Sequence, residues 1–158
     1  MGNILIHKLE LNIPEGFYEM DEEELSRMNF LSNGPCACLS DPERHMLITF
    51  GLKQTGRIVS ALLSIKDIGR NMGKYFSRWM KPYDYRQGDF LERRIAGLPS
   101  FGLSYYYEVQ DAGMYGESYA VKAGKDIYYL NLYTREASKE DSIALWDQIL
   151  SSARMKEN

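Results

Sequence analysis

Residues Leu98 to Arg135 read LPSFGLSYYYEVQDAGMYGESYAVKAGKDIYYLNLYTR, and this stretch decides the fold because it predicts three consecutive β-strands. Eight of the twelve tyrosines of the chain lie in it. Apolar and polar side chains alternate along residues 101–109, further strands are expected over 114–122 and 127–134, and short turns containing glycine separate the three runs. Such spacing is typical of antiparallel hairpins, so we expect an antiparallel meander at the centre of the fold.

Tyrosines on the more polar sides of these strands form the candidate contact surface. Tyr106 lies between Ser104 and Glu108 on the polar side of the first strand, and the third strand places a tyrosine, an amide and a tyrosine on one side. Whether the strands bring all of them to one face depends on the register, which the sequence does not give. The candidate binding residues are Tyr106, Tyr129, Asn131 and Tyr133. The alternative is that a helix covers these rings, or that they pair across strands to stabilise the sheet.

Two amphipathic helices are predicted to cover the sheet. Between Ser64 and Met80, apolar residues recur at spacings of three and four, which favours a helix with one buried face. Gly69 and Gly73 weaken its first part, so we expect regular helix only after Asn71. A last helix is expected from Ser138 to about residue 154, with Trp146 on its inner side.

The remaining segments give shorter elements. We expect one strand over residues 4–13, a short acidic helix after a capping box at Asp21 and Glu24, and a second capping box at Ser138 and Asp141. A short strand is expected at 36–39, a longer one at 45–53, and one or two strands over 83–95. Residues 58–63 fit a strand or a helix equally well, and the chain from Met155 onward is expected to fray. The whole order predicts an α+β fold: an α/β/α sandwich around a mostly antiparallel sheet.

Composition sets the class of protein. A chain of 158 residues predicts one domain, over residues 1–158, with a substantial core. The net charge of −3 gives no electrostatic reason to expect nucleic acid or an anionic membrane as partner. Two cysteines, no leader pattern and no long apolar run favour a soluble cytoplasmic protein without membrane insertion.

No stretch carries a complete catalytic or metal-binding motif. Cys36 and Cys38 with His45 supply at most three ligands where zinc takes four, so we expect neither a metal nor a required disulfide. The segment from Gly69 to Lys74 has three residues between its glycines and a tyrosine after the lysine, which departs from a phosphate-binding loop. We therefore expect no nucleotide or other cofactor.

Six titratable residues are candidates for general acid–base catalysis. The histidines, His7 and His45, have no nucleophile motif beside them. Four carboxylates are candidates for an acid–base pair, although strand and turn positions favour solvated carboxylates: Glu92, Glu108, Asp111 and Glu117. We therefore expect no enzyme.

The pattern resembles the Mog/PsbP-like superfamily, which includes DcrB-like bacterial proteins. Four features carry the resemblance: an opening strand ending in Ile13-Pro14-Glu15-Gly16-Phe17, the amphipathic helix ending near Trp79, the Gly97-x-Pro99 turn before Tyr105-Tyr106-Tyr107, and a final strand before the helix with Trp146. The resemblance implies an α/β/α sandwich and mostly binding roles, and it brings no catalytic residues.

The leading hypothesis is a non-enzymatic protein-binding module of the adaptor or chaperone type. The alternative is a carrier of a small molecule or lipid, with an apolar pocket between sheet and helix. An unrecognised hydrolase is the third possibility. The sequence gives no oligomeric state.

Overall fold

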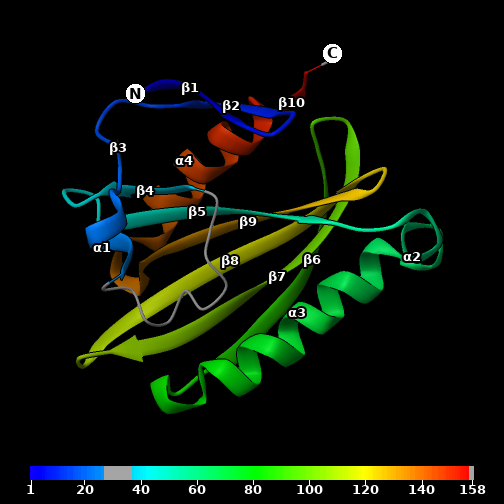
Figure 1. The fold of residues 1–158 in the computed structure, drawn as a ribbon. Helices are drawn as coiled ribbons and strands as arrows, with labels where there is room; N and C mark the ends of the chain where they lie inside the picture. The colour runs from blue at the N-terminus through cyan, green and yellow to red at the C-terminus, as the bar shows by residue number, and fades with distance from the viewer. Residues whose placement is uncertain (27–36, 157–158) are drawn as a thin grey trace.

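The structure, a computed structural model, describes residues 1–26 and 37–156 (Figure 1). Its elements are, in chain order, β1 (Gly2–Ile6), β2 (Leu9–Ile13), β3 (Tyr18–Glu19), α1 (Glu22–Ser26), β4 (Ala37–Asp41), β5 (Met46–Gln54), α2 (Arg57–Leu62), α3 (Ile65–Trp79), η1 (Lys81–Tyr83), β6 (Arg86–Ile95), β7 (Leu98–Val109), β8 (Ala112–Ala123), β9 (Asp126–Arg135), η2 (Glu136–Ser138), α4 (Lys139–Ser151) and β10 (Arg154–Met155).

A seven-stranded antiparallel sheet has the order β3-β4-β5-β9-β8-β7-β6, with the long meander β7–β8–β9 at its centre. Figure 1 shows α3 crossing one side of the sheet and α4 the other. The α+β fold and the α/β/α sandwich are therefore confirmed. A second, three-stranded sheet, in the order β1-β2-β10, lies on the α4 side and was not predicted.

Each face of the large sheet has its own apolar core. On the α3 face, Ile68 and Met72 pack against a set of rings and aliphatic side chains that includes Tyr105 and Tyr107. On the α4 face, Trp146 and Ile149 pack with residues of β2, β5 and β9. Full burial of one large apolar side chain contributes about 1.5–3 kcal/mol, so both helices are held mainly by this packing.

The glycines of α3 lie against the sheet. The helix begins at Ile65, after Ser64 has capped it by accepting a hydrogen bond from the amide of Asp67 at 3.1 Å. The expectation that regular helix starts only after Asn71 is wrong. A Cβ on Gly69 would stand 2.2 Å from Cδ1 of Phe101, so glycine is what lets the helix approach the strand this closely. Packing there outweighs the weak helix propensity of glycine.

Both ends of the chain differ from expectation. The segment expected as one strand over 4–13 is a hairpin, because His7 takes a left-handed conformation (φ 55°) and turns the chain without a glycine. The tail does not fray at Met155: Arg154 and Met155 pair with β2, and the amide of Lys156 donates to the carbonyl of Lys8 at 2.7 Å.

One of the two expected capping boxes is present. The amide of Glu24 donates to Oδ1 of Asp21 at 2.8 Å, and the amide of Asp21 donates to Oε1 of Glu24 at 3.4 Å. The second box is wrong, since the side chain of Ser138 makes no capping hydrogen bond. The 3-10 turn η2 ends at Ser138 and holds its ψ at 16°, far from the extended conformation of a capping residue.

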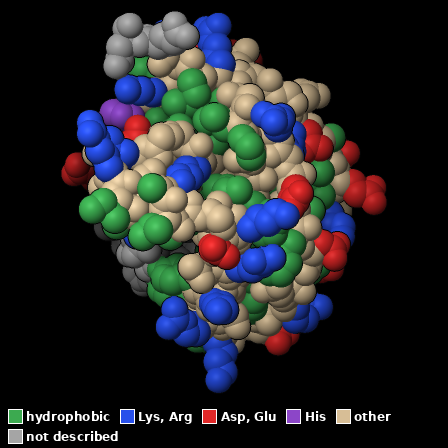
Figure 2. Space-filling view, turned by 90° about the vertical axis from the view of Figure 1, so that its right-hand side faces the viewer, with side chains coloured by type: hydrophobic (Ala, Val, Ile, Leu, Met, Phe, Trp, Pro, Cys, Tyr) green, Lys and Arg blue, Asp and Glu red, His purple; other side chains and the backbone are tan. Residues whose placement is uncertain are grey.

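The ambiguous segment 58–63 forms the short helix α2, which buries none of its residues. Ile58 is 78% exposed and Leu62 is 79% exposed. Figure 2 looks at the α2 end of the molecule and shows apolar side chains on the surface among many lysines and arginines. Among the described residues, no helix is long and apolar enough to cross a membrane.

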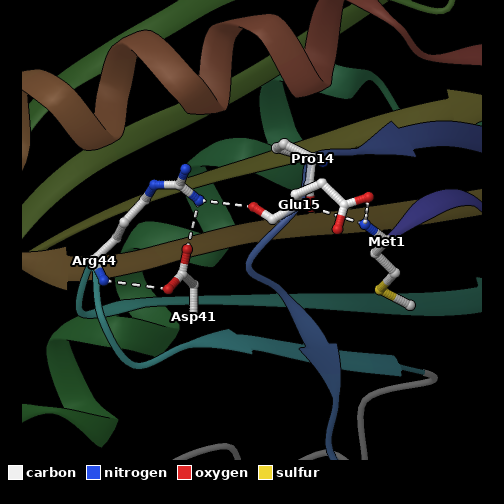
Figure 3. A network of polar contacts seen from close by, with 5 residues as sticks. All are labelled: Met1, Pro14, Glu15, Asp41 and Arg44. Carbon is white, nitrogen blue, oxygen red and sulfur yellow. Dashed lines mark hydrogen bonds and ion pairs between the residues drawn. The ribbon is translucent and has the colours of Figure 1, made fainter.

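A polar network joins two turns at the opposite end of the sheet (Figure 3). The guanidinium of Arg44 donates to the buried carboxylate of Asp41 at 2.6 Å and to the carbonyl of Glu15 at 3.0 Å. The amino group of Met1 donates to the carbonyl of Pro14 at 3.2 Å. The Arg44 bonds connect the chain between β2 and β3 to the β4–β5 turn, and the Met1 bond holds the first residue against the same segment.

Candidate functional site

Strand register places the four predicted contact residues on two faces of the sheet. Tyr106 pairs with Tyr115, which pairs with Thr134, and the hydroxyl of Thr134 hydrogen-bonds that of Ser142 on α4 at 2.8 Å. Directly paired residues of antiparallel strands point to the same side, so Tyr106 lies on the α4 face. The other three lie on the α3 face: Tyr129, Asn131 and Tyr133. A single contact face made of all four residues is therefore wrong.

The three residues on the α3 face differ in exposure. Tyr133 is 6% exposed, and its ring meets Tyr107 edge-on at 6.4 Å between centroids. Burial raises the pKa of Tyr133 to about 12. Tyr129 and Asn131 are half-buried, and the amide of Asn131 donates to the hydroxyl of Thr49 at 3.0 Å. Tyr133 is thus part of the core, and only Tyr129 and Asn131 remain partly accessible.

On the α4 face, two cations flank Tyr106. The ammonium of Lys139 donates to the Tyr106 hydroxyl at 2.7 Å and lies 5.0 Å from the ring centroid. The guanidinium carbon of Arg86 lies 5.7 Å from the same centroid. The hydrogen bond with Tyr106 raises the pKa of Lys139, which therefore keeps its positive charge. Tyr106, Arg86 and Lys139, called the Tyr106 patch below, combine a half-buried ring with two charges at the surface.

A buried carboxylate lies beside the Tyr106 patch. Glu117 is 4% exposed, and its two oxygens accept hydrogen bonds from the hydroxyls of Tyr115 at 2.8 Å and Tyr119 at 2.9 Å. Burial raises the pKa of Glu117, and the two tyrosine bonds oppose that rise. We call these three residues the Glu117 network. The Tyr115 ring meets the Tyr106 ring edge-on at 5.4 Å, so the network supports the patch from one side.

An ion pair extends the Glu117 network toward β6 and α4. Arg93 on β6 donates to Asp147 on α4 at 2.8 Å. Its guanidinium carbon also lies 5.7 Å from the centroid of the Tyr119 ring. Strand β6 and helix α4, which are distant in sequence, are therefore tied together directly beside the buried carboxylate.

This arrangement suits binding better than proton transfer. Both oxygens of Glu117 are held by tyrosine hydroxyls, and burial also raises the pKa of both Tyr115 and Tyr119 well above that of free tyrosine. The hydroxyls therefore stay protonated and keep donating. The Tyr106 patch, in contrast, offers a ring and two cations to a partner. A cation–π contact between the patch and a partner would contribute about 0.5–1 kcal/mol at an exposed site.

The structure describes two of the three residues that the sequence offers as metal ligands, Cys38 and His45. Cys38 is buried in β4, where burial raises the pKa of its thiol to about 12, and the thiol contacts the sulfur of Met20 at 3.4 Å. His45 is exposed in the turn before β5. Cys36 lies outside the described residues. Within residues 1–26 and 37–156, no group of three His, Cys, Asp or Glu side chains is placed to hold a metal ion.

The residues weighed for catalysis are dispersed. His7 lies in the β1–β2 turn, with Nε2 3.3 Å from the carboxylate of Asp126. Glu92 pairs with Lys66 of α3 at 3.1 Å, whereas Glu117 lies on the α4 face. The two remaining carboxylates are exposed: Glu108 and Asp111.

The segment weighed as a phosphate loop is a helix. Gly69 and Lys74 both lie within α3, and Gly73 packs against Gln87 and Leu103.

Sequence reasoning found Tyr106 but missed the cations around it. Arg86 is 20 residues before Tyr106 and Lys139 is 33 residues after it, and no local pattern links them. Only the β6–β7 register, which pairs Arg86 with Tyr106, and the path of α4 bring them together. The polar alternation around Tyr106 was the one available signal.

No protein-family model and no sequence of a curated protein matches this chain, but solved structures do. The solution structure of cyanobacterial PsbP (CyanoP) from Synechocystis sp. PCC 6803 is similar with a TM-score of 0.69 at 16% identity, over 94% of this chain and 86% of that one. LpqN of Mycobacterium tuberculosis, involved in cell envelope biogenesis, gives 0.65 at 15% identity, over 94% and 83%.

The Saccharomyces cerevisiae Ran-binding protein Mog1p gives a TM-score of 0.60 at 9% identity, over 98% of this chain and 96% of that one. Identities this low show only a shared fold, and each of the three comparisons spans at least 94% of this chain. Together with the seven-stranded antiparallel sheet between α3 and α4, they show that this chain has the Mog/PsbP-like fold.

Proposed function

We propose that residues 1–158 act as one non-enzymatic protein-binding module of the adaptor or chaperone type, with the Tyr106 patch as its contact site. The observation that carries this proposal is the half-buried Tyr106 ring flanked by Arg86 and Lys139. Tyrosine and arginine are the residue types that most often carry binding energy at protein interfaces. The Tyr115 ring of the Glu117 network packs edge-on against the Tyr106 ring, and a ring that is already held in place loses less entropy on binding.

Proteins of the same fold support the proposal by analogy. Mog1p is named a Ran-binding protein, and the immunity protein TplEi of Pseudomonas aeruginosa has been solved with a bound "L" peptide. Fold likeness alone does not assign a partner. The local geometry of the patch therefore remains the main support.

Tyr129 and Asn131 form a separate candidate contact on the α3 face. Both are half-buried, and the Asn131 amide is already engaged with Thr49, so this contact offers less free surface than Tyr106 does. We rank this contact second to the Tyr106 patch. Tyr133 is buried and would support it only by packing beneath it.

We propose the cytoplasm as the compartment. Cys38 is a free thiol whose burial raises its pKa to about 12, and such an inert buried thiol suits a reducing environment.

The test begins by identifying the partner through affinity capture and then measures its Kd for purified variants. Tyr106→Ala and Arg86→Ala should each weaken binding by about tenfold or more, because each removes a central interface group. The matched control is Tyr18→Ala, which removes another exposed tyrosine at the far edge of the sheet. Unchanged Kd values for Tyr106→Ala and Arg86→Ala, in variants with unchanged thermal melts, would refute the proposal.

A further inference from the structure

Positive charge is concentrated in one segment of an acidic chain. Residues 53–81 contain seven lysines and arginines and one acidic residue, a net charge of +6, whereas the whole chain carries −3 and the remainder therefore −9. All seven basic side chains are exposed, and we call them the basic face: Lys53, Arg57, Lys66, Arg70, Lys74, Arg78 and Lys81. Five of the seven lie on α2 and α3, Lys53 lies near the end of β5, and Lys81 begins η1. Helix α3 covers the side of the sheet opposite to the Tyr106 patch.

The arrangement on α3 follows from helix geometry. Lys66, Arg70, Lys74 and Arg78 recur every four residues, which aligns them along one side of a helix of about 22 Å. The buried residues Ile68 and Met72 lie on the other side, against the sheet. Two of the basic residues have acidic neighbours, Lys66 with Glu92 at 3.1 Å and Arg70 with Asp67 at 3.7 Å. Asp67 is already included in the net charge of +6, and counting Glu92 as well leaves this surface with +5.

Aliphatic side chains project from the end of the same face. In α2, Ile58, Val59 and Leu62 are 78%, 49% and 79% exposed. The helix is nevertheless fixed in place, because Lys122 donates to the carbonyls of Ser60 and Leu63, and Ser60 Oγ donates to the carbonyl of Gly124 at 2.7 Å. Polar bonds thus hold the backbone of α2 while its apolar side chains point outward.

We propose that α2 and the basic face dock on the surface of an anionic phospholipid bilayer. The basic residues attract a negatively charged binding partner. The projecting aliphatic side chains need an apolar layer directly below that charge, and an anionic bilayer provides both. The contact is peripheral: α2 enters the headgroup region and nothing spans the membrane.

Two other anionic occupants fit the surface less well. A nucleic acid would match the charge but would leave Ile58 and Leu62 in water. The rings of α3 are half-buried and therefore offer only part of their faces for bases to stack on: Tyr75, Phe76 and Trp79. An acidic protein would have to accept four lysines, a residue type depleted from protein interfaces, beside two aliphatic side chains that are almost fully exposed.

The experiment measures co-sedimentation of the purified chain with vesicles at low and physiological salt. One set is phosphatidylcholine alone, and the other contains about 30% phosphatidylserine, a composition that gives the bilayer a negative surface potential. The wild-type chain should bind the anionic vesicles, more weakly as salt rises, and should leave the neutral vesicles almost unbound.

Two double variants separate the charged and apolar contributions. Lys74→Gln with Arg78→Gln should weaken binding by about 25-fold, since each basic residue near the surface contributes about fivefold. Ile58→Ser with Leu62→Ser should weaken it by about tenfold or more. The matched control, Lys8→Gln with Lys156→Gln, removes the same charge from the three-stranded sheet on the α4 side and should leave most of the binding intact. Thermal melts confirm that each variant is folded.

Several results would overturn the proposal. One is no binding to anionic vesicles at low salt, or equal binding to both vesicle types. Another is an equal loss in the control variant, which would mean attraction by net charge alone. Tighter binding to duplex DNA, insensitive to the change at Ile58 and Leu62, would assign the face to nucleic acid. Concentration-dependent self-association lost in the basic-face variant would assign it to a second copy of this chain.

Discussion

Gly102 occupies a position in β7 where no side chain fits. A Cβ there would stand 1.9 Å from the backbone carbonyl oxygen of Ser118 on β8, and backbone cannot move aside as a flexible side chain can. We therefore expect Gly102→Ala to lower the free energy of unfolding by about 3 kcal/mol or more. Gly51→Ala in β5 is the matched control, because its Cβ would meet Tyr129 at an ordinary 3.7 Å. Chemical denaturation measures both, and similar values for the two variants would contradict the close approach at Gly102.

Glu117 makes stability depend on pH. Its pKa in the folded protein is raised by burial above the ordinary value of 4.5; Asp147 adds to the rise, and Tyr115, Tyr119 and Arg93 oppose it. A carboxyl raised in this way contributes stability that is fully present below pH 4.5 and is lost as the pH rises through the folded-state pKa.

The glutamine of the Glu117→Gln variant cannot ionise, so this variant does not lose stability through residue 117 as the pH rises. Relative to the wild-type protein, its melting temperature should rise as the pH is increased from about 4 to about 7. Thermal melts across this range test the prediction. A difference between the two proteins that stays constant with pH would mean that Glu117 does not titrate there.

At the scale of elements, the alternation of side chains predicted the meander, and apolar residues at helical spacing predicted the two packed helices. β8 and β9 extend past the predicted runs at both ends, and β7 begins three residues before its predicted start but ends at Val109 as predicted. The register could not be predicted, and a shift of one residue exchanges the two faces of a strand. That is why Tyr106 was grouped with Tyr133, although one lies on the α4 face and the other in the α3 core.

Segments whose conformation depends on distant contacts were also missed. The turn at His7 has no glycine or proline, and β10 exists only because β2 lies beside it. Helix α2 has no buried face to produce a helical pattern and is fixed by the side chain of Lys122, which is distant in sequence. None of these leaves a local signal in the chain.

Helix α4 illustrates an element held by one large side chain. Trp146 is fully buried with Ile149 and Leu150 at its side. Trp146→Ala should lower the free energy of unfolding by about 3–5 kcal/mol, through lost burial and the cavity left behind. Gln148→Ala, on the exposed side of the same helix, should change it by less than about 0.5 kcal/mol. Comparable destabilisation by both substitutions would mean that α4 is not docked through its tryptophan.

At the scale of the whole molecule, the small net charge does not reveal that positive and negative residues lie on different surfaces. A total of −3 argued against an anionic partner, yet residues 53–81 alone carry +6. Surface potential acts within about one Debye length, about 8 Å at physiological ionic strength, so a partner at α3 experiences the local charge rather than the sum. A protein of this size can therefore present opposite electrostatic surfaces at once.

The two proposed surfaces lie on opposite sides of the sheet, which predicts that both can be occupied together. The Tyr106 patch is on the α4 face, whereas five of the seven residues of the basic face lie on α2 and α3, and α3 covers the opposite side of the sheet. Once the protein partner is identified, the wild-type chain should carry it onto anionic vesicles in a flotation assay. Tyr106→Ala should stay on the vesicles and lose the partner, and Lys74→Gln with Arg78→Gln should keep the partner and lose the vesicles. Mutual exclusion of partner and vesicles would contradict this arrangement, because it would require the two surfaces to overlap or to be coupled through the sheet between them.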